Sequence, residues 1–108
     1  MKRTEILATL SRDLAEETNQ IRKMTGYEKE FHQASYRIWA MKEIYNLLKK
    51  TPSKDPEFVL GDFRADMDYY ALSSKASYIF SVAYDTATYY YDMCFGDGDS
   101  WTGQSVID

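Results

Sequence analysis

An apolar seam between Tyr27 and Lys50 constrains the fold of this chain more than any other feature. Its apolar side chains recur at alternating steps of four and three residues: Tyr27, Phe31, Ala34, Ile38, Met41, Tyr45 and Leu48. This spacing is typical of one face of an α-helix, and at 1.5 Å per residue the segment would be about 36 Å long. The sequence therefore predicts a long helix over 27–50 that is buried along one side against other helices.

A second apolar seam predicts an earlier helix over 4–25, which Thr4 is expected to cap. The seam consists of Leu7, Leu10, Leu14, Ile21 and Met24. Glu17 occupies the position at which an apolar residue is missing. Thr25-Gly26 is a stop signal, because glycine adopts the left-handed conformation that ends many helices. Such a short loop predicts an antiparallel hairpin of the two helices.

The back half begins with a helix-start signal at Asp55-Pro56-Glu57, which combines a capping acid with a proline at the first helical position. From Asp62 to Phe95 there is no Gly, Pro or Asn, which predicts a third long helix. Its seam is Tyr69, Leu72, Ala76, Ile79, Ala83, Thr86, Tyr90 and Met93. A straight helix over 62–95 would measure about 51 Å, too long for a chain of this size. It is expected either to bend near Ser73-Ser74 or to overhang and pair with a second copy.

The same segment also permits an alternative reading as strand. Larger side chains alternate with smaller or more polar ones at Tyr78, Phe80, Val82, Tyr84, Thr86, Thr88 and Tyr90. This pattern would give an α+β fold with a C-terminal β-hairpin. No tight-turn dipeptide divides the segment, so the all-α class is favoured. The predicted architecture is a single helical domain over 1–108, made of a helical hairpin and a long third helix, with an irregular tail from about 96 to 108.

Charge is distributed unevenly along the chain, whose net charge is −4. Residues 1–50 contain ten Lys/Arg and seven Asp/Glu, whereas residues 51–108 contain three and ten. The front half is therefore net +3 and the back half net −7. Tyrosine is in excess, with ten in 108 residues. Such a distribution is expected either if the halves attract each other or if the acidic half faces a basic partner.

Candidate catalytic and metal-binding residues are few. His32 is the single histidine, and Glu28 lies one turn before it, but two ligands do not make a metal site. Cys94 is the single cysteine and is predicted to be a buried structural thiol. The segment 97–102 begins like a calcium loop but has Trp101 and Thr102 where an acid and a glycine are required. We therefore expect no enzyme activity, no metal and no cofactor.

The remaining classes are limited by hydropathy and charge. No apolar run is long enough to span a membrane, and no signal peptide is recognisable at the N-terminus. The lone cysteine cannot form an internal disulfide, which favours a cytoplasmic location. A net negative chain without an aromatic-interleaved basic patch is not expected to bind nucleic acid directly.

The acids and tyrosines of the back half are the best candidates for a binding surface. Acids at the C-terminal end of a helix are disfavoured by the helix dipole, so Asp92, Asp97 and Asp99 suggest a surface kept for a partner. The predicted partner-binding residues are Asp62, Asp66, Asp68, Tyr69, Tyr91, Asp92, Asp97, Asp99 and Trp101. Aspartates would supply charge and the aromatic rings would act as anchors.

The sequence therefore predicts a non-enzymatic protein-binding module whose acidic, tyrosine-rich face occludes a basic surface. Nucleic-acid-binding proteins own such surfaces, because they bind phosphates with Lys and Arg. In composition alone the chain is similar to small acidic inhibitors of phages and mobile elements, including DNA mimics and anti-CRISPR proteins. The alternative is a homodimeric helical bundle with a structural or assembly role and no inhibitory activity, in which Tyr78, Tyr84 and Tyr89 would lie between the copies.

Overall fold

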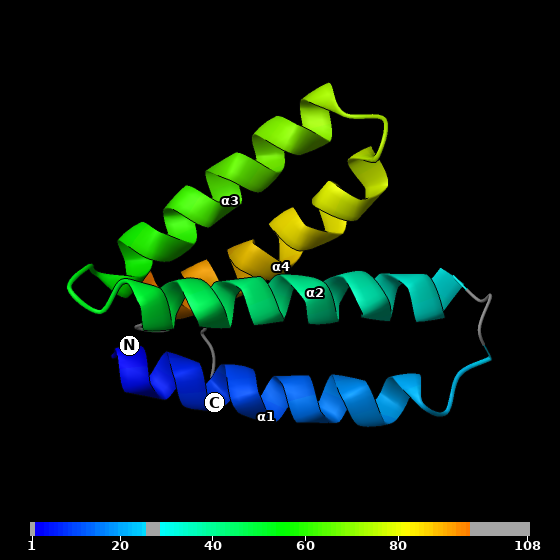
Figure 1. Cartoon of the computed structure of the whole chain (residues 1–108), viewed down its shortest axis with the longest axis horizontal. Helices are drawn as coiled ribbons and strands as arrows, with labels where there is room; N and C mark the ends of the chain where they lie inside the picture. The colour runs from blue at the N-terminus through cyan, green and yellow to red at the C-terminus, as the bar shows by residue number, and fades with distance from the viewer. Residues whose placement is uncertain (1, 26–28, 96–108) are drawn as a thin grey trace.

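The computed structural model of this chain describes residues 2–25 and 29–95, which form four α-helices (Figure 1). The helices are α1 (Arg3–Ile21), α2 (Lys29–Lys50), α3 (Pro56–Ser73) and α4 (Ser77–Phe95). No strand occurs among the described residues. The predicted all-α class is thus confirmed. The alternative with a C-terminal β-hairpin is not supported, because the alternating segment from Tyr78 to Tyr90 lies within α4.

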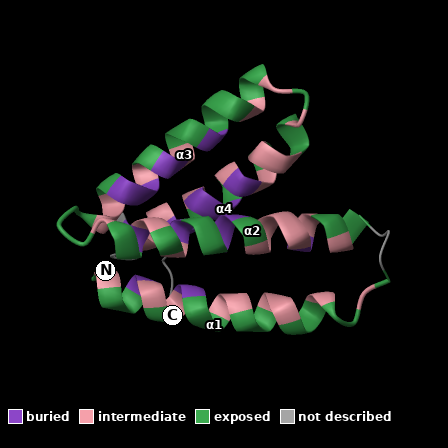
Figure 2. Ribbon diagram, in the orientation of Figure 1, coloured by how far each residue is buried: buried purple, intermediate pink, exposed green. Residues whose placement is uncertain are grey.

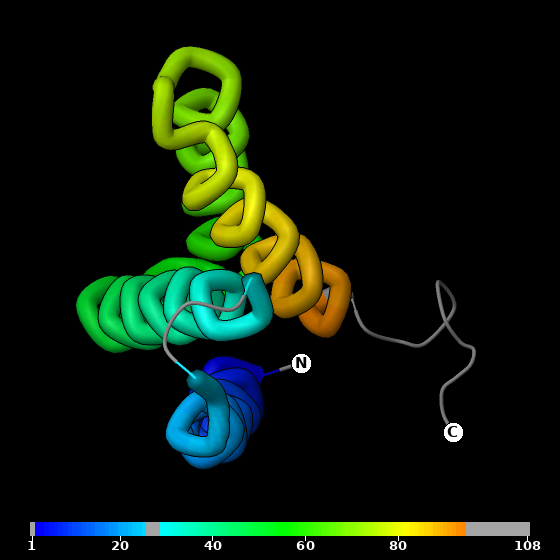
Figure 3. The backbone as a smooth tube through the Cα atoms, turned by 90° about the vertical axis from the view of Figure 1, so that its right-hand side faces the viewer, coloured from blue at the N-terminus to red at the C-terminus, as the bar shows by residue number. Residues whose placement is uncertain are grey.

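The helices form two antiparallel hairpins, α1 with α2 and α3 with α4 (Figure 1). Helix α2 is the central element, since α1 packs along one side of it and α4 packs against another side. The α3–α4 hairpin is inclined to α2, so that one of its ends projects away from the first hairpin (Figure 1). Seen from the end, α1 and α3 lie on opposite sides of α2 (Figure 3).

The first predicted hairpin is confirmed, with different helix ends. Thr4 does not cap α1, because the helix begins one residue earlier and Lys2 is the N-cap. The backbone N–H of Lys2 donates to Oε1 of Glu5 (2.8 Å). Helix α1 ends at Ile21, and the predicted stop at Gly26 falls outside the described residues. The seam of α2 is confirmed in part: Ala34, Met41 and Leu48 are buried, whereas Phe31, Ile38 and Tyr45 are only half-buried. Ala40 and Ile44, outside that seam, are also buried, and Tyr27 lies outside the described residues.

The start signal at Asp55-Pro56-Glu57 is confirmed by the cap of α3. Asp55 is the N-cap, and its carboxylate accepts a hydrogen bond from the backbone N–H of Glu57 (2.9 Å). Pro56 follows at the first helical position, where its missing N–H costs nothing. The capping chemistry is local, and this explains why the sequence predicts it correctly.

The prediction of one long third helix is wrong, because the chain reverses between Ser73 and Ser77 (Figure 1). Ser74 leaves the helical conformation (φ −117°, ψ 150°), and its Oγ accepts the backbone N–H of Ala76 (3.0 Å). A straight helix of about 51 Å would exceed the largest dimension of the molecule, which is 37 Å. The expected bend site was correct, but the chain folds back there instead of bending.

The reversal also divides the seam predicted over 69–93. Ala83, Thr86 and Tyr90 are buried in α4 as expected. Tyr69 and Leu72 belong to the separate helix α3, where they are 67% and 83% exposed. The two ends of that seam therefore do not face the same core, because the spacing of a helical seam is not maintained across a chain reversal.

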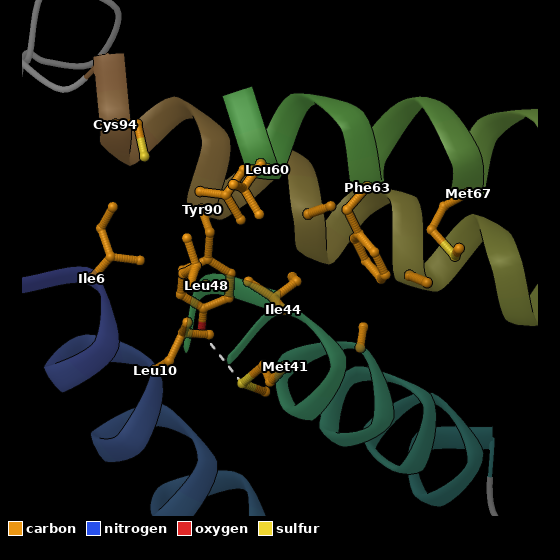
Figure 4. Close-up of a cluster of buried hydrophobic side chains, with 14 residues drawn as sticks. Ile6, Leu10, Met41, Ile44, Leu48, Leu60, Phe63, Met67, Tyr90 and Cys94 are labelled. Carbon is orange, nitrogen blue, oxygen red and sulfur yellow. Dashed lines mark hydrogen bonds between the residues drawn. The ribbon is translucent and has the colours of Figure 1, made fainter. Parts of the chain in front are cut away.

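The hydrophobic core lies where all four helices meet (Figures 2 and 4). Its largest members are Ile6 and Leu10 from α1, Ile44 and Leu48 from α2, Leu60 and Phe63 from α3, and Tyr90 from α4. The projecting end of the second hairpin contributes no buried residue to this core: none from 68 to 82 is buried, and Phe80 packs against the core only as a half-buried ring. None of the described helices combines the length and the hydrophobicity that crossing a membrane requires.

Candidate functional site

A cleft of about 600 Å³ lies between α1 and α4, with α2 as its floor. We call it the α1/α4 cleft. It exists because α1 runs alongside α2 whereas α4 crosses α2 at an inclination, so the two outer helices diverge (Figure 1). The acids that line it are Asp13, Glu16 and Glu17 from α1 and Asp85 from α4. Its apolar and aromatic walls include Met41, Val82, Tyr89 and Tyr90.

One basic side chain, Arg37, is found among the described residues that line the cleft. Arg37 projects from α2 and is already paired with Glu17 of α1. Its Nε and Nη2 lie 3.0 Å from the two carboxylate oxygens of Glu17, a bidentate arrangement that fixes both groups. This pair explains why Glu17 interrupts the apolar seam of α1, since its position faces the cleft and not the core.

Tyr90 closes the inner end of the cleft. Its ring is 2% exposed, and its hydroxyl donates to Oδ2 of Asp13 (2.8 Å). The hydroxyl also lies 3.3 Å from the sulfur of Met41, as the dashed line in Figure 4 shows. Burial, followed by the neighbouring carboxylate of Asp13, raises the pKa of the Tyr90 phenol well above its usual range. The phenol therefore remains a neutral donor.

Glu16 and Asp85 are exposed on opposite walls of the cleft. Among the described residues neither has an ion-pair partner. Four carboxylates against one guanidinium give the lining a net charge of −3, which attracts cations into the concave site. Tyr89 is 51% exposed beside Asp85, and its ring meets that of Tyr90 edge to face, with centroids 5.0 Å apart.

The chemistry that the cleft offers is recognition of a cation. Its groups are carboxylate acceptors, two phenols and a small apolar wall. Within the described part of the chain, no group of three or more His, Cys, Asp or Glu side chains is arranged to hold a metal ion. An extended organic cation, such as an arginine or lysine side chain, matches acceptors that are spread over two walls.

The residues predicted from the sequence lie elsewhere. Asp62, Asp66, Asp68 and Tyr69 are all exposed on α3. Asp92 is half-buried on α4, and at about 100° per residue it lies on the same side of that helix as Asp85. Asp97, Asp99 and Trp101 lie outside the described residues.

Tyr91, another predicted binding residue, lies at the contact between α4 and α3. The guanidinium of Arg64 stacks over its ring at 4.1 Å from the centroid. The ring also packs against Gly61, where an added Cβ would come within 3.1 Å of Cε2. Tyr91 is thus brought together with α3 and is only half-exposed.

The other candidates of the sequence occupy ordinary environments. His32 is exposed, and its ring meets that of Phe31 edge to face at 5.7 Å. Its expected neighbour Glu28 and the calcium-like loop over 97–102 lie outside the described residues. Cys94 is buried as predicted, at 4% exposure, and burial raises the pKa of its thiol to about 11.

The acids of the cleft were missed by the sequence analysis, although two of them carry a signal. Glu17 breaks an apolar seam, and Asp85 is the one charged residue between Lys75 and Asp92. The sequence does not show that Asp13, Glu16 and Glu17 all line one cleft, because this depends on how α1 packs on α2. Counting charges by halves hid it, because these acids belong to the half that is net positive.

No protein-family model matches this sequence, and neither a curated protein nor a solved structure gives a significant match to it.

Proposed function

We propose that this protein is a non-enzymatic binding module and that its α1/α4 cleft receives basic side chains of a protein partner. One observation carries the proposal: carboxylates on two facing helices line a concave site of about 600 Å³ whose single arginine is already paired. A volume of this size is typical of sites that bind ligands.

An arginine of the partner is the best match to the site. Its guanidinium can accept neither proton nor hydrogen bond, and its five N–H donors suit acceptors on both walls, Glu16 on α1 and Asp85 on α4. The exposed ring of Tyr89 offers a face for cation–π stacking. The methylene groups would lie against Val82.

The proposed partner is a nucleic-acid-binding protein, because such proteins expose arginines and lysines that contact phosphates. An acidic cleft that takes up those side chains would compete with the nucleic acid for them. The protein would then act by occlusion, in the manner of small acidic inhibitors of phages and mobile elements. Strong dependence on salt is expected, since the attraction is between charges that are partly exposed.

A competition experiment tests this proposal. Labelled duplex DNA is first bound by an arginine-rich peptide, and the protein is then titrated in while the release of DNA is followed by fluorescence anisotropy. We expect release at low ionic strength and little release at high ionic strength. Glu16→Gln and Asp85→Asn should each require about three to ten times more protein, because each removes an acceptor from the cleft.

Glu43→Gln is the matched control, since it removes the same charge from an exposed position of α2 outside the cleft. It should behave as the unmodified protein. The proposal fails if the three variants are indistinguishable, because the effect would then follow total charge and not the site. It also fails if DNA release does not respond to salt.

The homodimeric bundle remains the alternative, and one observation favours it. Tyr78 and Tyr89, two of the three tyrosines expected between copies, are 44% and 51% exposed on α4. The third, Tyr84, packs against the core of its own chain. Sedimentation equilibrium distinguishes the two functions: a stable dimer that Tyr78→Ser and Tyr89→Ser dissociate would favour the structural role over the binding module.

A further inference from the structure

The outer face of α3 carries an apolar stripe that none of the described residues covers. Phe58, Tyr69 and Leu72 are 56%, 67% and 83% exposed, and Ala65 between them is also exposed. At about 100° per residue, these four positions fall within a sector of about 60° around the helix. The stripe extends over about 21 Å, or four helical turns. Figure 2 shows exposed residues along the side of α3 that faces away from α4.

Carboxylates border this α3 stripe on both edges. Asp62 and Asp66 follow one edge, about 40° and 80° from Phe58, and Asp68 lies about 80° away on the other edge. All three aspartates are exposed. The stripe thus has the composition of a protein contact, an apolar centre with a charged rim, instead of the mixed pattern of a solvated helix.

The cations close to the stripe do not neutralise this rim. Arg64 is turned toward α4, where its guanidinium stacks over the Tyr91 ring. The ammonium of Lys54 lies 4.8 Å above the ring of Phe58, at one end of the stripe only. From Pro56 to Ser73 the helix has four acids and one base, a net charge of −3.

The aromatic part of the stripe is held in place from the side. The ring of Tyr69 meets that of Tyr70 edge to face at 5.5 Å, and Tyr70 in turn contacts Phe80 of α4 at 5.4 Å. A supported ring loses less conformational freedom when a partner covers it. Ala65, at the middle of the stripe, is small enough to let another helix approach closely.

We propose that the outer face of α3 is a docking surface for an amphipathic helix of a protein partner, one whose apolar stripe is flanked by lysine or arginine. Charge complementarity selects this occupant. A second copy would bring an α3 of net −3 against the first, whereas basic flanks would pair with Asp62 and Asp66 on one edge and Asp68 on the other. Phe58 and Leu72 would be the anchors at the two ends.

This surface is separate from the cleft, to which α3 contributes no residue. The proposal does not rest on the function of the cleft, and either can fail alone. Variants of α3 test the docking surface, and variants of Glu16 and Asp85 test the binding of basic side chains in the cleft.

The test uses the full chain and a fluorescent peptide of about 14 residues, which covers four helical turns. Its leucines are placed at helical spacing and its other positions are lysine. Two further peptides are controls: one with the same composition in scrambled order, and one with glutamate in place of lysine. We expect the patterned peptide to bind at least about ten times more tightly than the scrambled one, and the glutamate peptide not to bind.

Variants locate the binding. Tyr69→Ser with Leu72→Ser should weaken binding of the patterned peptide at least about tenfold, because it removes two of the three large apolar side chains of the stripe. Both side chains are mostly exposed, so the fold should be retained, and circular dichroism checks this. Tyr78→Ser is the matched control, an exposed tyrosine of α4 outside both the stripe and the cleft, and should leave the affinity unchanged. Asp66→Asn should weaken binding a few-fold and reduce its salt dependence.

Three results would overturn the proposal. Equal binding of the patterned and scrambled peptides would mean charge attraction without a stripe. Equal binding by the Tyr69→Ser/Leu72→Ser variant would place the peptide elsewhere. A dimer of the unmodified chain that this variant dissociates would show that the stripe pairs with a second copy and not with a basic helix.

Discussion

Tyr90 is the residue at which the hydrophobic core and the α1/α4 cleft meet. Its ring is packed among core side chains (Figure 4). Its hydroxyl donates to the carboxylate of Asp13 at the inner end of the cleft. A buried hydroxyl must have a partner, because leaving it unpaired costs about 1–3 kcal/mol. Packing of the core therefore also determines where one of the four acids of the cleft is placed.

Cys94 gives a prediction about pH. Burial raises the pKa of its thiol from 9.0 to about 11 in the folded chain, so the folded state keeps its proton to higher pH than the unfolded state. The stability that this group contributes is complete below pH 9 and is lost as pH rises toward 11. We expect the free energy of unfolding to fall by about 1–2 kcal/mol more between pH 8 and pH 10 in the unmodified protein than in Cys94→Ala.

Urea denaturation at several pH values measures this difference, and the comparison is between slopes, because Cys94→Ala also removes a packed side chain. The Tyr90 phenol titrates above this range and remains in both proteins. Equal slopes in the two proteins would mean that the thiol is as accessible in the folded state as in the unfolded one.

At the scale of single residues, the sequence predicts which side chains are buried but not which side chains on other helices they contact. It predicts correctly that Cys94 is buried, because the thiol lies on an apolar helix face. It identifies Glu17 as an irregular member of a seam. The partner of Glu17 is Arg37, twenty residues away on another helix, and no periodicity within one helix can specify that pair.

At the scale of the secondary-structure elements, local chemistry determines where α3 starts but not where it ends. Asp55 and Pro56 specify the start through a side-chain cap and a fixed φ angle, so the sequence predicts it. No glycine or proline marks the end of the helix at Ser73 in the sequence. The reversal there is decided by packing, because folding back buries the apolar faces of α3 and α4 against each other and against α2.

Arg3 connects the start of α1 to the end of α2 and to the loop between α2 and α3. Its guanidinium donates to the carbonyls of Leu48, Thr51 and Lys54. Helix C-termini leave carbonyls without partners, and a planar fork of donors satisfies several at once. We expect Arg3→Lys to lower the free energy of unfolding by about 1–2 kcal/mol, since a single ammonium cannot serve all three carbonyls.

Urea denaturation measures this effect as well, with Arg12→Lys as the control. Arg12 also lies on α1, but 72% of its side chain is exposed and its contact with Asp13 is long, at 3.7 Å. That substitution should change the free energy by less than about 0.5 kcal/mol. Similar losses in the two variants would contradict a joining role for Arg3.

At the scale of the whole molecule, the α3–α4 hairpin is buried at only one of its two ends. No residue from 68 to 82 is buried, although this arm carries Tyr69, Tyr70 and Leu72. Segments with few buried contacts open locally at lower free energy than the core. We expect amide hydrogens of α3 and α4 within 68–82 to exchange with opening free energies at least about 2 kcal/mol below those of 83–94.

Hydrogen exchange followed by mass spectrometry on the full chain measures this gradient, and the core segment of α2 around Ile44 is the internal reference. Uniform protection along α4 would contradict the prediction and would indicate that something covers the arm. Adding a peptide that occupies the α3 stripe should slow exchange in the arm, but not in α1.

The two walls of the α1/α4 cleft belong to different hairpins, α1 to the first and α4 to the second. Whatever spans the cleft therefore bridges the two hairpins, which also meet at α2, in the core and at the hydrogen bond from Tyr90 to Asp13. By thermodynamic linkage, a molecule that binds only the folded protein in this way would raise the melting temperature by an amount set by its concentration and affinity. Substitutions in the contact between α2 and α4 would in turn change the affinity of the bound molecule without contacting it, because this contact sets the distance between the two walls of the cleft.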